Sequence, residues 1–297
     1  MYTFLLLAAL LIALPVQAEE ITGTTASGAG IVQSGSGTQT DSTQQLLSQI
    51  SAMREDLAIW IPERKETLLA SKEKLQSFAT ETDRFLKQSR LARQECHDAV
   101  RRANRDTLLR TITVCLRAEL LEEMQFLRKE EQYVGLLPLL TESVRADATK
   151  YIRELIDAQM TVINAIDAGV YLDREGVQES RVKLRDRYRS PYWLAMTHVR
   201  AERELTWVGL IVKRIESLLH AGLQDPAGLP RLSEAISCLD SGRVMLRTSL
   251  EATEPSLALE QLQEAKTNLS ACDDPLRAVL RLERKRQAAA KTEKGTE

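Results

Sequence analysis

The four cysteines of this chain fall into two pairs, and a helix-breaking turn lies between the members of each pair. Cys96 and Cys115 stand on either side of an Ala-Asn-Arg-Asp turn, and Cys238 and Cys272 are each 17 residues from Pro255. When two antiparallel helices are joined by a tight turn, residues equidistant from the turn lie side by side, within reach of a disulfide. Four cysteines permit three pairings, and only one of them uses both turns. We therefore predict disulfides 96–115 and 238–272, each across one helical hairpin.

These cysteines are predicted to hold the structure together and to carry no chemistry. Their spacing is far from the C-x₂₋₄-C spacing of zinc modules, and Cys96-His97 lacks the C-x-x-C-H pattern of a haem attachment site. In the chain-entropy account, loops of these lengths stabilise a fold by about 3 to 4 kcal/mol each when closed. No cofactor and no metal is predicted.

The first residues predict export. An apolar segment at 4–15 is followed by Val16-Gln17-Ala18, a small-x-small cleavage pattern, and it is too short to span a bilayer. We expect a signal peptide over 1–18 that is cleaved after Ala18. The mature protein is then periplasmic or secreted and has no transmembrane span. An uncleaved anchor is the alternative, because the segment before the apolar stretch lacks Lys and Arg. Export leads to an oxidising compartment, where disulfides form. The composition favours a bacterial host, while the glycosylation sequon at Asn268 leaves eukaryotic secretion open.

In the rest of the chain, turn and helix-capping residues separate a series of predicted helices. A Gly/Ser/Thr-rich tract at 19–44 is predicted to be a disordered tether, because it holds too little apolar surface to offset the entropy of ordering. After it, apolar residues recur at helical spacing and no segment alternates like a strand. The predicted helices span 41–59, 63–103, 107–134, 139–168, 173–188, 190–220, 229–249 and 255–271, with a final one from 273. The predicted domains are a long bundle at 45–222 and a stapled hairpin with the final helix at 229–290, followed by a disordered tail at 291–297.

The segment 63–103 carries a heptad-like seam. One residue set recurs every seven positions, and a second set lies between its members. The first set is Leu68, Leu75, Thr82, Ser89, Cys96 and Ala103, and the second is Ser71, Phe78, Phe85, Ala92 and Ala99. Such a repeat is typical of coiled-coil-like packing, and it puts Cys96 on the inward face. We predict an all-α fold, an elongated antiparallel helical bundle with coiled-coil-like long helices.

Motifs of known chemistry are not found in the sequence. It has no G-x-S-x-G, H-E-x-x-H or Walker pattern, and its three histidines are scattered along the predicted helices. A net charge of −2 gives no reason to expect nucleic acid as a partner. The sequence therefore predicts a protein that is not an enzyme, without catalytic residues.

One segment stands out as a possible docking patch, because cations and aromatic side chains are concentrated at a predicted helix boundary. Its members are Arg185, Arg187, Tyr188, Arg189, Tyr192 and Trp193. Arg and aromatic residues are enriched in binding hot spots. The alternative is a corner between helices, in which Trp193 and Trp207 are buried and the Arg side chains run along them to water.

The leading functional hypothesis is an exported, non-enzymatic scaffold or adaptor of the periplasm or cell envelope. It would act through protein–protein contacts with an envelope or secreted partner, as an accessory subunit of a secretion, conjugation or motility machine. A second hypothesis is a bundle that binds haem, metal or lipid, for which the conceivable ligands are Met124, Met160, Met196 and His198. A third is a carboxylate-dependent helical hydrolase or lyase. The sequence does not indicate an oligomeric state.

Overall fold

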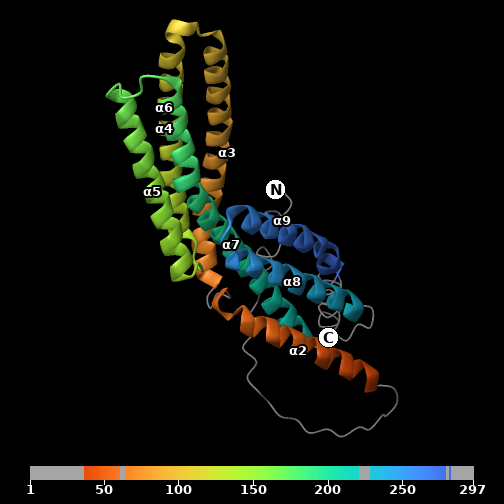
Figure 1. Ribbon diagram of the computed structural model, residues 1–297. Coiled ribbons are helices and arrows are strands. Elements are labelled where there is room, and N and C mark those ends of the chain that lie inside the picture. The colour runs from red at the N-terminus through yellow and green to blue at the C-terminus, as the bar shows by residue number, and fades with distance from the viewer. Residues whose placement is uncertain (1–36, 61–64, 221–227, 279–280, 282–297) are drawn as a thin grey trace.

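The chain folds into α-helices joined by short connections (Figure 1). The computed structural model describes residues 37–60, 65–220, 228–278 and 281, and no strand occurs among them. The elements in chain order are α2 (Gly37–Asp56), the 3₁₀ turn η1 (Ala58–Trp60), α3 (Lys65–Arg102), α4 (Arg105–Leu136), α5 (Glu142–Asp167), α6 (Arg174–Lys183), the π-helical η2 (Leu184–Arg189), α7 (Ser190–His220), α8 (Gly228–Glu251) and α9 (Pro255–Ala271). The predicted all-α bundle is confirmed.

The helix ends follow from local sequence. Asn104, Thr141 and Asp173 precede α4, α5 and α6, and the side chain of each accepts a hydrogen bond from the backbone N–H three residues further on. These caps satisfy donors that the first turn of a helix leaves without partners. Just beyond the end of α5, Gly169 adopts φ 67°, the left-handed conformation that glycine enters without steric penalty.

Helices α3 and α4 form an antiparallel hairpin, which we call the arm. The predicted disulfide between Cys96 and Cys115 is present, with a Cα–Cα distance of 5.6 Å. Further from the turn, contacts keep the same symmetrical register: Phe85 stacks on Phe126, Glu81 pairs with Lys129, and Phe78 stacks on Tyr133. Turn symmetry therefore extends along the hairpin and is not limited to the cysteines.

The heptad-like seam of α3 faces α4. From Phe78 to Ala103, every seam residue is buried or half-buried, whereas nearly all other positions in this span are exposed. Ser89 is a polar residue of the seam, yet it is only 7% exposed. Its polarity therefore does not prevent this position from facing α4. Side chains of the seam at 68–75 lie outside the described residues. Coiled-coil packing in the strict sense stays a prediction.

Helix α7 connects the two halves of the molecule. In its first half, residues such as Tyr192 and Val199 pack with α4 and α5. In its second half, residues such as Leu205 and Ile215 pack with α2, α8 and α9. A third apolar cluster joins α4, α5, α6 and η2. Figure 1 shows the resulting arrangement, with the arm, α5 and α6 at one end and α2, α8 and α9 at the other.

Helices α8 and α9 form the second stapled hairpin. The predicted disulfide between Cys238 and Cys272 is present, with a Cα–Cα distance of 5.6 Å. At Gly242 the two helices approach so closely that an added Cβ would lie 2.5 Å from the side chain of Leu269. Nearer the turn, the Ser249 hydroxyl donates a hydrogen bond of 2.8 Å to a carbonyl of α9. The disulfide therefore joins helices that are also closely packed.

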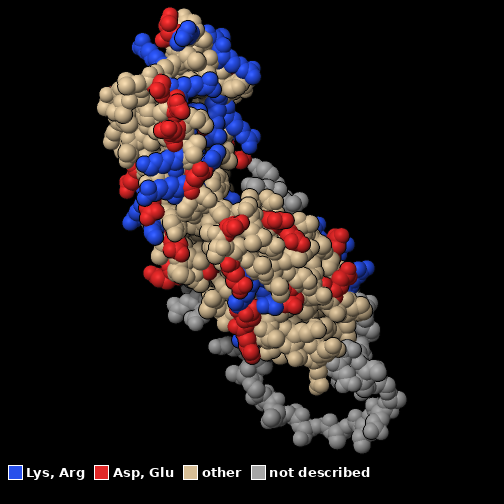
Figure 2. Space-filling view, viewed as in Figure 1, with Lys and Arg blue, Asp and Glu red and all other residues tan. Residues whose placement is uncertain are grey.

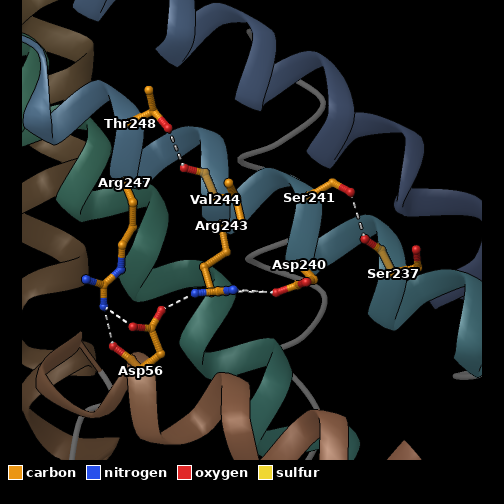
Figure 3. A network of polar contacts seen from close by, with 8 residues as sticks. All are labelled: Asp56, Ser237, Asp240, Ser241, Arg243, Val244, Arg247 and Thr248. Atoms are coloured by element: carbon orange, nitrogen blue, oxygen red, sulfur yellow. Dashed lines mark hydrogen bonds and ion pairs between the residues drawn. The ribbon is translucent and has the colours of Figure 1, made fainter.

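An ionic cluster fastens α2 to this hairpin (Figure 3). Arg243 of α8 pairs with Asp240 of its own helix at 2.7 Å and with Asp56 at the end of α2. Arg247 pairs with Asp56 as well, donates to its backbone carbonyl at 2.7 Å, and lies 5.1 Å from the ring centroid of the buried Trp60. Two guanidinium groups thus converge on one carboxylate, and the start of the described chain is joined to a segment far away in sequence.

The chain does not break where a new helix was predicted at Ser190. Ser190 has helical angles of φ −62° and ψ −52°, and its N–H donates to the Arg185 carbonyl five residues earlier. Residues 174–220 form one helix interrupted by the π-helical turn η2. The wider turn immediately precedes Pro191, whose ring would clash with the preceding turn of a regular α-helix. The predicted separation of a helix at 173–188 from one at 190–220 was therefore wrong, because a π-turn accommodates the proline.

Several predicted segments and boundaries fall at or beyond the edges of the described structure. Helix α2 begins at Gly37, so residues 37–44 of the predicted tether are helical, while 19–36 lie outside the described residues. The predicted signal peptide over 1–18, the domain boundary near 222 and the tail at 291–297 also lie outside them. Residues on both sides of that boundary contribute to one apolar cluster; the division into domains stays a prediction.

Candidate functional site

The predicted docking patch is divided between a buried and an exposed part. Its six residues lie on η2 and on the first turn of α7. Tyr192 is 4% exposed and belongs to an apolar core, and Tyr188 is half-buried against it. Arg189 pairs with Glu123 of α4. The exposed members are Arg185, Arg187 and Trp193.

The corner interpretation of this segment is wrong for one of its two tryptophans. Trp193 is 49% exposed, with its ring edge against Tyr192 at a centroid distance of 5.3 Å. Adjacent helix residues point about 100° apart; at this position Tyr192 faces the core and Trp193 faces outward. Trp207 is half-buried against the core of the C-terminal half, whereas the corner interpretation has it buried.

A buried carboxyl group lies beneath the patch. Glu130 of α4 is 6% exposed and accepts a hydrogen bond from the Tyr192 hydroxyl. Burial raises the pKa of the Glu130 carboxyl from 4.5 to about 7; the Tyr192 hydrogen bond and the positive charge of Arg200 oppose this shift, and the negative charge of Glu123 adds to it. Burial and the Glu130 charge also raise the pKa of Tyr192. This pair joins α4 to α7 inside the core, so it has a structural role.

A cleft of about 270 Å³ opens between α4 and the helix formed by α6 and η2, and we call it the α4–α6 cleft. Its apolar lining consists of Leu116, Leu120, Val182 and Leu184. Three arginines line it at four-residue intervals: Arg181, Arg185 and Arg189. A π-turn holds more residues than an α-turn, so residues four apart within η2 lie closer to one line along the helix than they would in a regular α-helix.

Glu119 connects the two sides of this region. Its carboxylate lies 3.5 Å from Arg93 of α3 and 3.7 Å from Arg181 of α6. Both distances exceed a normal hydrogen bond between charged groups. The two guanidinium groups therefore share one carboxylate, and their N–H donors stay able to bind further acceptors. Arg93 thus marks the edge of the α4–α6 cleft on the α3 side, and Figure 1 shows α3, α4 and α6 running alongside one another.

The far end of the arm is basic. Residues 84–110 contain eight Lys and Arg against three Asp and Glu, a net charge of +5. Within the described part of the chain, six of these cations are exposed and form no ion pair: Arg84, Lys87, Arg90, Arg101, Arg105 and Arg110. By contrast, residues 228–278 carry five basic and eight acidic residues, a net charge of −3. Figure 2 shows the basic side chains along the arm and the acidic ones spread over α8 and α9.

The residues considered as ligands of a haem or metal do not converge. Met124 and Met196 are buried in separate apolar clusters, whereas Met160 is 37% exposed. The His198 ring lies 3.2 Å from the Ala252 carbonyl oxygen. Among the described residues, no group of three or more His, Cys, Asp and Glu side chains is arranged to hold a metal.

Sequence reasoning missed part of the α4–α6 cleft. Arg93, Glu119 and Arg181 come from three helices, and only the folded register brings them together. One signal was present in the sequence: Arg181 continues the four-residue spacing of Arg185 and Arg189 by one step toward the N-terminus. That spacing predicts a basic face on one helix, but it does not indicate the apolar floor that α4 supplies.

Comparison with protein-family models, curated proteins and solved structures finds no match for this chain. Within the described residues, no helix is both long and apolar enough to cross a membrane.

Proposed function

We propose that this protein is an exported, non-enzymatic helical scaffold or adaptor of the periplasm or cell envelope. It acts through protein–protein contacts, and its arm is the binding element. A signal peptide cleaved after Ala18 directs the chain to an oxidising compartment, in keeping with two disulfides among the described residues. The role we favour is an accessory subunit of a larger envelope assembly for secretion, conjugation or motility.

The observation that carries this proposal is the uneven environment of α3. One face of the helix packs on α4, and the opposite face bears exposed cations without ion-pair partners in the described structure, together with Leu91, which is 63% exposed. Cations elsewhere in the described structure are often paired, for example in the Asp56 cluster (Figure 3). A long helix held in place by a disulfide, with one open basic face, has the form of a rigid docking element.

Retention of a partner by the purified protein tests this function. The full mature chain is immobilised and exposed to an envelope extract of the organism that makes it, and retained proteins are quantified. We expect one partner at near-stoichiometric yield, and we expect the triple substitution Lys87→Glu, Arg90→Glu and Leu91→Ser to abolish its retention.

The matched control changes charge on the other hairpin. Glu260→Lys with Glu264→Lys alters exposed residues of α9 and leaves the arm intact. We expect this variant to retain the partner as the wild type does. Retention of no protein by the wild type, or equal loss in both variants, would contradict an adaptor that binds through its arm.

A further inference from the structure

We propose that the α4–α6 cleft receives an acidic amphipathic helix of the partner protein. This inference rests on the adaptor function proposed above and specifies the chemistry of what the arm recognises. The occupant would insert apolar side chains between α4 and α6 and place carboxylates against the arginines at the rim.

The floor of the α4–α6 cleft suits apolar side chains. Leu116 and Leu120 of α4 are almost fully buried, and Leu184 of η2 is 3% exposed. At the rim, Val182 is 36% exposed, and on α3 Leu86 is 43% exposed. Leu86 lies seven residues before Arg93 and therefore on the same face of α3, the face that reaches Glu119. The leucines of the floor expose little surface, so the apolar area open to a docked helix lies at the rim, on Val182 and Leu86.

The charges of the α4–α6 cleft favour an acidic occupant. Of its three arginines, Arg189 is paired with Glu123 of α4, whereas Arg181 shares the carboxylate of Glu119 with Arg93 at distances of 3.7 and 3.5 Å. Arg185 pairs only with its neighbour Asp186, and both side chains are more than half exposed. An exposed pair of this kind contributes about 0 to 1 kcal/mol, so a partner carboxylate can replace Asp186 at little cost.

The shape of the α4–α6 cleft favours a helix over a lipid surface. The arginines line a recess whose floor is apolar side chains, and the headgroup plane of a bilayer does not enter a recess of about 270 Å³. A helix with apolar residues at every third or fourth position fits such a floor and projects its polar residues to both sides. The field of the arm, at net +5 over residues 84–110, steers an acidic helix toward this end of the molecule.

Titration of the full mature protein with synthetic helices tests the proposal. The probe is a fluorescent peptide of about 15 residues, near the length at which isolated helices become stable, with Leu along one face and Glu on the others. Its counterpart carries Lys in place of Glu. We expect saturable binding of the Glu peptide by fluorescence anisotropy and none of the Lys peptide.

Charge reversal locates the binding. Arg181→Glu with Arg185→Glu should weaken binding of the Glu peptide roughly tenfold or more, because two charge-assisted contacts become repulsive. The matched control is Lys150→Glu with Lys213→Glu. Both control residues are exposed, lie on α5 and α7, and belong neither to the lining of the α4–α6 cleft nor to residues 84–110. We expect binding to this control to change less than about twofold, the range of a long-range charge effect screened by salt.

A second variant keeps the test valid if the first does not fold. Arg181→Gln with Arg185→Gln removes charge without repulsion from Glu119, and it replaces the Glu variant if that protein fails to fold. No binding of the Glu peptide to the wild type, equal weakening in cleft and control variants, or tight binding of anionic phospholipid vesicles that the cleft variants lose would overturn the proposal. If the envelope extract yields a partner but the cleft variants retain it fully, the adaptor function stands and this inference fails.

Discussion

The buried Glu130 carboxyl makes stability depend on pH in the direction opposite to that of a salt-bridged acid. Because burial raises its pKa from 4.5 to about 7, the folded protein holds a proton at this site between those pH values, whereas the unfolded chain has released it. The stabilising contribution of the protonated group is fully present below pH 4.5, decreases through that window, and is lost above pH 7.

The magnitude follows from the size of the shift. At about 1.4 kcal/mol for each pH unit, the change from 4.5 to about 7 corresponds to at most about 3 kcal/mol of unfolding free energy. Glu130→Gln keeps the shape and an acceptor for the Tyr192 hydroxyl but cannot ionise. We expect the variant to match the wild type near pH 4.5 and to be more stable by up to about 3 kcal/mol at pH 8.

Denaturant unfolding from pH 4.5 to 8.5, followed by circular dichroism, measures this difference. Glu154→Gln serves as the matched control, because Glu154 is exposed on α5, and its difference from the wild type should stay near zero throughout. A Glu130→Gln variant that is less stable than the wild type at pH 8, or a difference that does not grow with pH, would refute the reasoning from burial.

Four further variants probe how the helices are held together. Gly242→Ala should destabilise by about 1 to 2 kcal/mol in thermal or denaturant unfolding, because its Cβ would overlap the buried side chain of Leu269. Gly135→Ala, with open space around it, should stabilise by about 0.5 to 1 kcal/mol through helix propensity. Replacing Cys238 and Cys272 by Ser should cost about 4 kcal/mol of unfolding free energy, and a midpoint unchanged from the wild type would contradict it. Asp56→Ala should speed hydrogen exchange in α2 selectively, measured by mass spectrometry, because two arginines lose their shared acceptor.

The fold was predictable from the sequence where local signals determine it. Helices end at caps and turns, which depend on a few neighbouring residues, and a tight turn fixes the register of the two helices it joins. Cys96 and Cys238 could be paired correctly for that reason, since each disulfide lies within one hairpin.

Features that depend on contacts between distant segments were not predictable in this way. Pro191 taken alone indicates the start of a helix. In the structure α6, η2 and α7 follow one another without a break, and the helix passes Pro191 through a π-turn. The sequence does not indicate which of the adjacent Tyr192 and Trp193 faces inward. Tyr192 does so, and its hydroxyl donates a hydrogen bond to Glu130 of another helix. The bridging position of Glu119 likewise results from three helices meeting.

The claim that a partner protein binds at the α4–α6 cleft is tested most directly inside producing cells. A photo-reactive amino acid replaces Val182 at the rim of the α4–α6 cleft, and in a separate strain it replaces the exposed Gln263 on α9. After irradiation, adducts are detected by immunoblot and identified by mass spectrometry. We predict one discrete protein adduct from position 182, formed with an acidic helical segment, and none from position 263. The absence of any adduct at position 182, or equal adducts from both positions, would contradict the account.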